Sequence, residues 1–183
     1  MERLISIKSV DDIPARHRRT PIGRLLEYHN LKKKVSHYDE PQLLIGMCMD
    51  NRKRLRIPDR FAFILRTGGA NLSHHEFKVS YAIAVGNIRH VVLIGHTNCS
   101  MVDLHLRREQ FILGLVEGAG WNRLDAEKHF DKYSPTFEIN NAKDFVVSEA
   151  KRFNIKYPKI EIVPLMYRLE DNLLYMIDQE AYK

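Results

Sequence analysis

Two cysteines and one histidine of this chain have the types and positions needed to bind a metal ion. Cys48 follows the apolar run 42–47, and Cys99 comes three residues after His96, which ends a second apolar run. Two thiolates and one imidazole suit zinc, and a catalytic zinc ion keeps three protein ligands and an open fourth position. The pattern predicts a zinc (Zn²⁺) enzyme with Cys48, His96 and Cys99 as metal ligands.

The segment after Cys48 adds a carboxylate and a guanidinium group. Along an extended backbone, side chains two residues apart point to the same side, so Asp50 and Arg52 can face the same site as Cys48. Arg52 can hold Asp50 through a bidentate ion pair. A helix starting near Cys99 would further favour its thiolate.

Each of these residues also has an ordinary structural explanation. A cysteine after a strand is often a core residue, an Asp-x-Arg pair is commonly a surface ion pair, and His96 alone can be a core or capping residue. A disulfide between the cysteines is a further alternative. What favours the metal site is the joint pattern, in which both cysteines follow apolar runs of the same kind.

Four apolar runs predict the strands that position these residues. They cover residues 43–48, 61–65, 90–94 and 159–163. Such runs, rich in branched residues, are typical of parallel strands buried on both faces. Ligands bind beyond the carboxyl ends of these strands, so the cysteines and His96 can meet there. The paired glycines at 68–69 should lie beside the same site, because glycine allows close backbone approach.

Capping signals and apolar periodicity predict the helices. Thr20 and Pro21 suit the start of a helix over 21–31. Further helices are expected over 73–85, 99–108, 109–117, 122–132 and 141–153. Asp171-Asn172 suits a hairpin turn onto an antiparallel edge strand at 173–177. The order of elements predicts an α/β fold with a mostly parallel central sheet, about four parallel strands plus an antiparallel edge strand, flanked by helices.

Length and composition limit the class of protein. The 183 residues suit one domain, and domains of this size bury roughly 70% of their unfolded surface. No apolar run approaches the roughly 18 residues of a membrane span, and the first residues do not resemble a signal peptide, so we expect a cytoplasmic protein with reduced thiols. The net charge of +6 comes from scattered basic groups without a nucleic-acid-binding motif, so nucleic acid is not an expected partner.

The two clusters resemble the motifs of the β-class carbonic anhydrases. Cys48-Met49-Asp50-Asn51-Arg52 resembles their Cys-x-Asp-Ser-Arg motif, and Gly95-His96-Thr97-Asn98-Cys99 resembles their Gly-His-x-x-Cys motif. The turn 66–70 resembles their Arg-Asn-Ala-Gly turn. The resemblance is strong over about 42–105 and weaker over 159–177.

The sequence departs from the family pattern at three points. Asn51 stands where the first motif has serine, and Ser100 stands where glycine usually follows the second cysteine. A glutamine that many members place near the substrate has no clear counterpart here.

The resemblance implies zinc bound by Cys48, His96 and Cys99, with Asp50 and Arg52 as the catalytic dyad. It implies a lyase, a carbonate dehydratase, that reversibly hydrates carbon dioxide to bicarbonate and a proton by a zinc-bound hydroxide oriented by the dyad. Asp50 can also become a fourth ligand in a closed form. We expect the substrate pocket to include Thr67, Gly68, Gly69 and Tyr81.

Two alternative functions fit the same residues, and the resemblance also implies an assembly of several subunits. Carbonyl sulfide or carbon disulfide can replace carbon dioxide as the substrate, since close relatives in the class hydrolyse them. The chain can also be a non-catalytic, zinc-stabilised binding or regulatory domain. The resemblance further implies a homodimer or higher homo-oligomer, with residues 1–183 forming one zinc-binding domain and 1–40 an N-terminal arm and helix that packs on a partner subunit.

Overall fold

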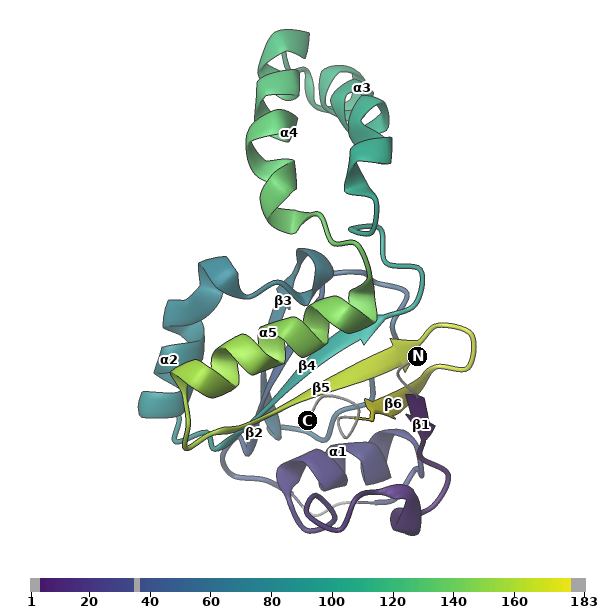
Figure 1. Ribbon diagram of the computed structural model, residues 1–183, viewed down its shortest axis with the longest axis vertical. Coiled ribbons are helices and arrows are strands. Elements are labelled where there is room, and N and C mark those ends of the chain that lie inside the picture. The colour runs from purple at the N-terminus through teal and green to yellow at the C-terminus, as the bar shows by residue number, and fades with distance from the viewer. Residues whose placement is uncertain (1–3, 35–36, 179–183) are drawn as a thin grey trace.

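A six-stranded sheet forms the centre of the protein in the computed structural model, which describes residues 4–34 and 37–178 (Figure 1). The strand order is β1-β6-β5-β4-β2-β3. The strands are β1 (Leu4–Ser6), β2 (Leu43–Cys48), β3 (Ala62–Thr67), β4 (His90–His96), β5 (Glu161–Arg168) and β6 (Leu173–Ile177). Residues 1–3 of the predicted arm and 35–36 of the following connector lie outside the described residues.

The parallel part of the sheet confirms the α/β prediction. Strands β3, β2, β4 and β5 run parallel, and β6 is antiparallel to β5, as expected. The expected place of β6 at the sheet edge is wrong, because β1 pairs with its outer side, with Leu4 opposite Ile177. β1 has only three residues, which is too short for the alternation that signals a strand in a sequence.

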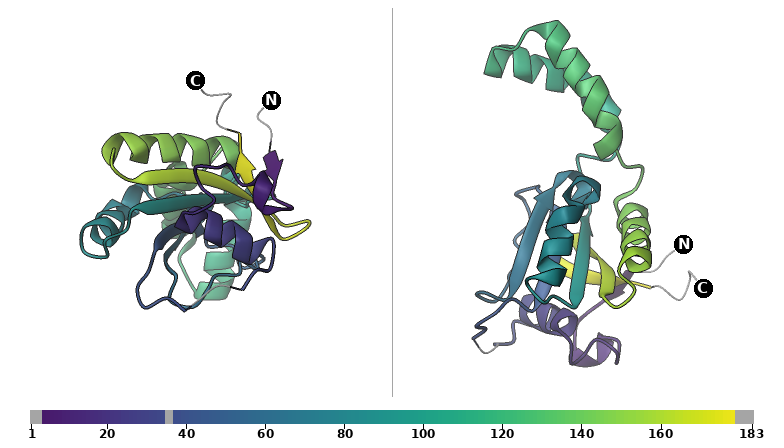
Figure 2. Two further views of the ribbon diagram at one scale, coloured as in Figure 1. Left: turned by 90° about the horizontal axis from the view of Figure 1, so that it is seen from below. Right: turned by 90° about the vertical axis from the view of Figure 1, so that its left-hand side faces the viewer.

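Helices cover both faces of this sheet (Figures 1 and 2). The helices are α1 (Pro21–His29), α2 (Glu76–Ala84), α3 (Arg108–Ala119), α4 (Arg123–Phe137) and α5 (Ala142–Lys156). One core contains α1 with alternate residues of β2 and β4, including Ile45 and Val92. The other contains α2 and α5 with the intervening residues, including Leu44 and Val91. Both faces of the parallel strands are therefore buried.

α1 packs its apolar side on its own sheet. Ile22, Leu25 and Leu26 are fully buried in the first core. This contact accounts for the apolar periodicity of the helix within one chain. A contact between the N-terminal arm and a partner subunit stays a prediction.

One predicted helix is wrong. Residues 100, 101 and 103 lie in turns, Val102 forms an isolated bridge with Ile139, and Leu104–Arg107 forms a short 3-10 helix in place of an α-helix over 99–108. Asn98 and Asp103 have positive φ angles of 53° and 50°, which interrupt a right-handed helix. The turns carry the chain away from the sheet into α3.

α3 and α4 form a helical hairpin that projects from the body of the protein (Figures 1 and 2). Its two helices bury Ile112, Ala126 and Phe130 between them. α5 then returns the chain to the sheet. None of the helices in the described part of the chain combines the length and apolar content needed to cross a membrane.

A buried histidine ties α1 to the rest of the fold and makes stability depend on pH. His29 Nε2 donates to the carbonyl oxygen of Asn172 at 2.9 Å, and its Nδ1 accepts from the backbone N–H of Arg56 at 3.0 Å. This pattern requires the neutral ring, and burial lowers the pKa of His29 because it disfavours the charged form.

We therefore expect acid to destabilise the protein partly through His29. Its contribution should be complete above about pH 6.5, the pKa of an unfolded-state histidine, and should be lost as the pH falls from there through the lower folded-state pKa. His29→Gln should lower the free energy of unfolding at pH 7.5 by about 1–2 kcal/mol and flatten its decline towards pH 5. Urea unfolding across pH measures both effects, with exposed His37→Gln as the control. An unchanged pH slope in His29→Gln would contradict this assignment.

Candidate metal centre

The sheet brings the three predicted metal ligands together. Cys48 ends β2, His96 ends β4, and Cys99 lies in the turn that follows β4. Because β2 and β4 are neighbouring parallel strands, their carboxyl ends meet at one edge of the sheet. The two sulfurs and an imidazole nitrogen lie within 4.8 Å of one another, and each residue is at most 6% exposed.

The geometry of these three residues fits a tetrahedral metal ion. Zinc–sulfur bonds of about 2.3 Å place two tetrahedral sulfur ligands about 3.8 Å apart, and the sulfurs of Cys48 and Cys99 are 3.9 Å apart. His96 Nδ1 donates to the carbonyl oxygen of Thr97 at 2.8 Å, which leaves Nε2 with a free lone pair. Nε2 is buried and has no hydrogen-bond partner in the described part of the protein. A metal ion bound to this nitrogen would provide the missing partner for its lone pair.

Both cysteines are free thiols, so the disulfide alternative does not hold in this structure. A disulfide bond would require the sulfurs to be about 2.05 Å apart. A hydrogen bond from the Cys99 thiol lowers the pKa of Cys48 to about 3, and the neighbouring Cys48 sulfur raises the pKa of Cys99. The lowered pKa favours the thiolate form of Cys48, which is the form that ligates metals.

Asp50 and Arg52 form the ion pair that the sequence predicts. Arg52 Nε and Nη2 contact the two carboxylate oxygens at 3.0 and 2.5 Å, and the Arg52 backbone N–H donates to Asp50 Oδ1 at 2.9 Å. Arg52 Nη2 also donates to the carbonyl oxygen of Asn98 at 2.8 Å, which connects the loops after β2 and β4.

This ion pair lies beside the candidate metal ligands. Asp50 Oδ2 is 3.9 Å from His96 Nε2. The guanidinium of Arg52 holds the pKa of Asp50 well below its usual range, so the carboxylate is ionised at every physiological pH.

Lys53 is a residue of the site that the sequence does not distinguish. Its side chain is only 6% exposed, and Nζ donates to the carbonyl oxygen of Asp50 at 2.8 Å. Burial lowers its pKa, but the charges of Cys48 and Asp50 oppose this shift. In the sequence Lys53 lies within the basic segment 52–56, and nothing there separates it from its exposed neighbours.

Three of the four predicted pocket residues lie next to Cys48. Thr67 pairs with Cys48 across β2 and β3, and its hydroxyl donates to the carbonyl oxygen of Asn71 at 2.6 Å. The backbone N–H of Gly69 donates to the Cys48 sulfur, which favours the thiolate. At Gly68, a Cβ atom would come within 3.1 Å of the Met101 sulfur, so glycine permits the close packing of this turn.

The fourth, Tyr81, is not brought to the candidate metal ligands by its own chain. It lies on α2 and is 54% exposed. A role for Tyr81 in a pocket therefore stays a prediction.

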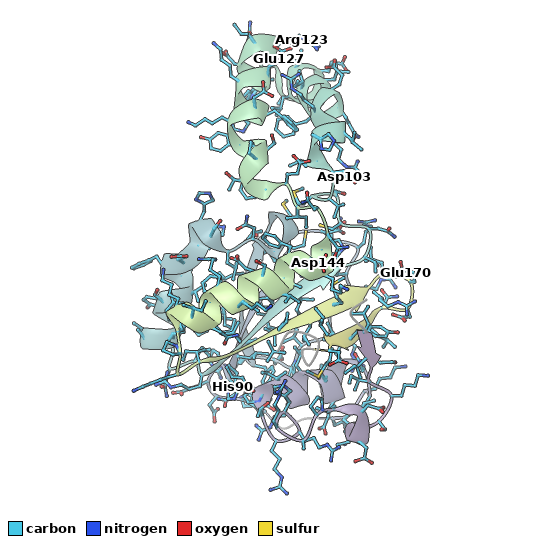
Figure 3. The ribbon with its side chains drawn as sticks, in the orientation of Figure 1. His90, Asp103, Arg123, Glu127, Asp144 and Glu170 are labelled. Carbon is cyan, nitrogen blue, oxygen red and sulfur yellow. The ribbon has the colours of Figure 1, made fainter. Side chains whose placement is uncertain are left out.

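A cavity of about 660 Å³ opens beside His96 and Cys99. Most of the side chains that line it are polar or charged, among them Asn98, Arg107, Asn141, Lys143 and Glu170. Glu170 accepts a hydrogen bond from the Thr97 hydroxyl at 2.9 Å and lies at this end of the sheet (Figure 3). None of the four predicted pocket residues lines this cavity.

Comparison with known proteins shows similarity in structure. No protein-family profile and no curated protein matches the sequence. A β-carbonic anhydrase isoform from Trichomonas vaginalis superimposes with a TM-score of 0.62 and 16% identity, covering 85% of this chain and 93% of that one. A carbonic anhydrase from Glaciozyma antarctica gives a TM-score of 0.56 and 20% identity, over 90% and 99% of the two chains.

A carbon disulfide hydrolase in its apo form is also similar. It gives a TM-score of 0.55 and 17% identity, covering 79% of this chain and 85% of that one. The resemblance noted in the sequence motifs is thus matched by the topology of the whole sheet. This chain has the fold of the β-carbonic anhydrases.

Proposed function

We propose that this protein is a zinc-dependent enzyme that reversibly hydrates carbon dioxide to bicarbonate and a proton. The observation that carries the proposal is the position of Asp50, an ionised carboxylate held by Arg52 at 3.9 Å from the unpartnered nitrogen of His96. A structural metal site does not need an oriented carboxylate beside it, whereas a site that hydrates carbon dioxide needs such a carboxylate to orient the attacking oxygen.

Each residue has a distinct part in the proposed mechanism. Cys48, His96 and Cys99 would hold zinc, which supplies a water molecule whose pKa is lowered to roughly 7. Asp50 would accept a hydrogen bond from the attacking oxygen, which turns the lone pair of that oxygen towards the carbon of the substrate. Arg52 keeps Asp50 ionised and fixed, and Asn98 fixes Arg52 through its carbonyl oxygen.

The same residues allow a closed form in which Asp50 becomes a fourth metal ligand. Asp50 would then have to leave Arg52, since its carboxylate cannot keep both contacts in their present geometry. The intact pair with Arg52 supports an open arrangement in this structure. It also supports an enzyme over a non-catalytic zinc domain, for which a permanent fourth ligand is expected.

Hydrolysis of carbonyl sulfide or carbon disulfide is the second candidate, because one similar structure is a carbon disulfide hydrolase. The polar cavity beside the metal ligands favours hydration of carbon dioxide. Bicarbonate is an anion, and Arg107 and Lys143 line the cavity through which it would pass. Carbon disulfide is apolar, and it gains little from charged side chains.

The test combines metal analysis with two assays of the purified protein. We expect one zinc ion per chain and stopped-flow hydration of carbon dioxide that rises with pH. Sulfide release from carbonyl sulfide and carbon disulfide should be slower in the same preparation. Faster sulfide release would favour the second candidate, and zinc without either turnover would favour the non-catalytic domain.

We also propose that the chain forms a homodimer through β3 and α2. Among the strands that the structure describes, β3 lies at the sheet edge with one unpaired side, and Gly86, which follows α2, packs against the Phe63 ring. Both elements expose large apolar side chains, namely Phe63 and Ile64 on β3, Phe77 and Tyr81 on α2, and Val85 directly after α2. Exposed large apolar side chains beside a strand edge are typical of an interface, and pairing of two copies would protect that edge.

Phe77→Glu is expected to convert the dimer to a monomer, since the substitution places a charge in the buried centre of the interface. Phe77 is 81% exposed in the single chain, so the substitution should leave the fold of each subunit unaffected. Sedimentation velocity at micromolar concentration measures the mass. Leu124→Glu, on the projecting hairpin, is the matched control and should leave the dimer intact. A dimeric Phe77→Glu variant would place the interface elsewhere.

A further inference from the structure

A second cavity lies at the opposite end of the parallel strands from the candidate metal centre. It has a volume of about 290 Å³ and is lined by the start of α1 and by the segments that precede β2 and β4. His90 lines it at the start of β4, whereas His96 ends the same strand beside the metal ligands. A strand of seven residues spans about 20 Å, and His90 and Glu170 lie far apart in Figure 3.

Three arginines converge on this cavity from different parts of the chain. Arg19 lies just before α1, Arg24 lies near its start, and Arg89 precedes β4. Arg89 Nη1 donates to the carbonyl oxygens of Ile83 and Ile88 at 3.3 and 3.1 Å, which fixes its guanidinium group. Arg19 and Arg24 form no ion pair or hydrogen bond through their side chains with any residue that the structure describes.

The lining carries an excess of positive charge. Glu40 is the carboxylate of the lining, and it forms no ion pair with any of the three arginines in the described chain. α1 also begins here, at Pro21, and the Thr20 hydroxyl donates to the carbonyl oxygen of His17 at 2.9 Å without capping the helix. The positive end of the helix dipole therefore adds to the field of the arginines.

We infer that this cavity binds the phosphate group of a small phosphorylated anion. Guanidinium groups donate two parallel hydrogen bonds to phosphate oxygens, so several arginines around one cavity suit a phosphate group better than a single carboxylate. A volume of about 290 Å³ is near the lower limit of small-ligand pockets. Among the described residues, no phenylalanine, tyrosine or tryptophan lines the cavity, so it lacks the large aromatic surface on which nucleic-acid bases commonly stack.

Calorimetric titration of the zinc-loaded full chain with inorganic phosphate and with pyrophosphate tests the inference. We expect saturable binding at one site per chain, tighter for pyrophosphate because it carries more charge. The double variant Arg19→Gln/Arg24→Gln should weaken binding at least about tenfold, since each lost charge-assisted hydrogen bond is individually worth more than that factor. Both side chains are exposed, so the variant should fold normally.

The control variant is Lys128→Gln/Lys132→Gln, which removes the same charge from the exposed surface of α4. It should change pyrophosphate binding less than twofold. Equal weakening in the two double variants, or no saturable binding by the unaltered protein, would overturn the inference. Carbon dioxide hydration by Arg19→Gln/Arg24→Gln should be unchanged, so the result is independent of the proposed function.

A lipid headgroup and a soluble metabolite can supply the same phosphate chemistry. Sedimentation with vesicles of phosphatidylcholine containing phosphatidic acid separates these sources. Sedimentation that depends on Arg19 and Arg24 would identify a lipid, whereas binding of pyrophosphate without sedimentation would identify a soluble ligand.

Discussion

Cys99→Ser is expected to remove zinc from the protein and to abolish turnover. A serine hydroxyl stays protonated near neutral pH, so the site would keep only the Cys48 thiolate and the His96 imidazole. Loss of residues that merely orient metal ligands costs 10- to 100-fold in affinity, so loss of a ligand should cost at least about a hundredfold. Zinc content after dialysis and competition with a chromophoric chelator measure the effect.

The neighbouring Ser100→Ala variant is the control for Cys99→Ser. Ser100 lies in the same turn and contributes no ligand atom to the Cys48–His96–Cys99 group. It should retain one zinc ion per chain and near-normal turnover. A fully zinc-loaded Cys99→Ser protein would mean that the ligand set is misassigned.

Asp50→Asn is expected to keep zinc and lose most of the catalytic rate. Asparagine has the same shape, but it is neutral and cannot accept the hydrogen of the attacking water with comparable strength. Misplacing a reacting group by about 1 Å costs about 10²-fold in rate, so kcat should fall by at least about that factor. Zinc analysis together with stopped-flow hydration distinguishes this outcome from simple loss of metal.

Arg52→Lys is expected to have a catalytic rate between those of the unaltered protein and Asp50→Asn. Lysine keeps the positive charge but cannot form the two-pronged contact that Arg52 makes with Asp50, nor the additional hydrogen bond to Asn98. A smaller loss of rate than in Asp50→Asn is expected, with unchanged zinc content. Normal turnover in Asp50→Asn would remove this pair from the mechanism.

We expect that Asp50 is not the group whose titration sets the pH dependence of the rate. Arg52 holds the pKa of Asp50 well below its usual range, so Asp50 remains ionised as the pH falls from 8 to 5. A decline in rate over this interval must therefore come from another group. Arg52→Lys should leave the midpoint of that decline in place, because Asp50 would still be ionised throughout it.

The residues of the candidate metal site could be predicted from the sequence because they depend on local patterns. Cys48 and His96 each end an apolar run, and buried parallel strands produce such runs. Neighbouring strands then place their carboxyl ends together, as β2 and β4 do here. The Asp50–Arg52 pair could be predicted for the same reason, since its partners are two residues apart.

Other features depend on contacts between distant segments. β1 is a strand because β6 lies beside it, and three residues carry no periodicity of their own. Lys53 is buried by the surrounding site, although its sequence neighbours are exposed. The helix expected over 99–108 gives way to turns with positive φ angles, which no residue type in that segment requires.

The sequence alone therefore determined the candidate metal ligands, the neighbouring carboxylate of Asp50 and the parallel strands that carry these residues. Only the tertiary structure decided that β1 forms an edge of the sheet. It also decided which polar residues line the cavity beside the candidate metal ligands, and it brings three arginines together at the far end of the strands. The physical reason is that side-chain type and strand periodicity are local properties of the chain. Burial and the grouping of charges arise only when segments far apart in the sequence pack together.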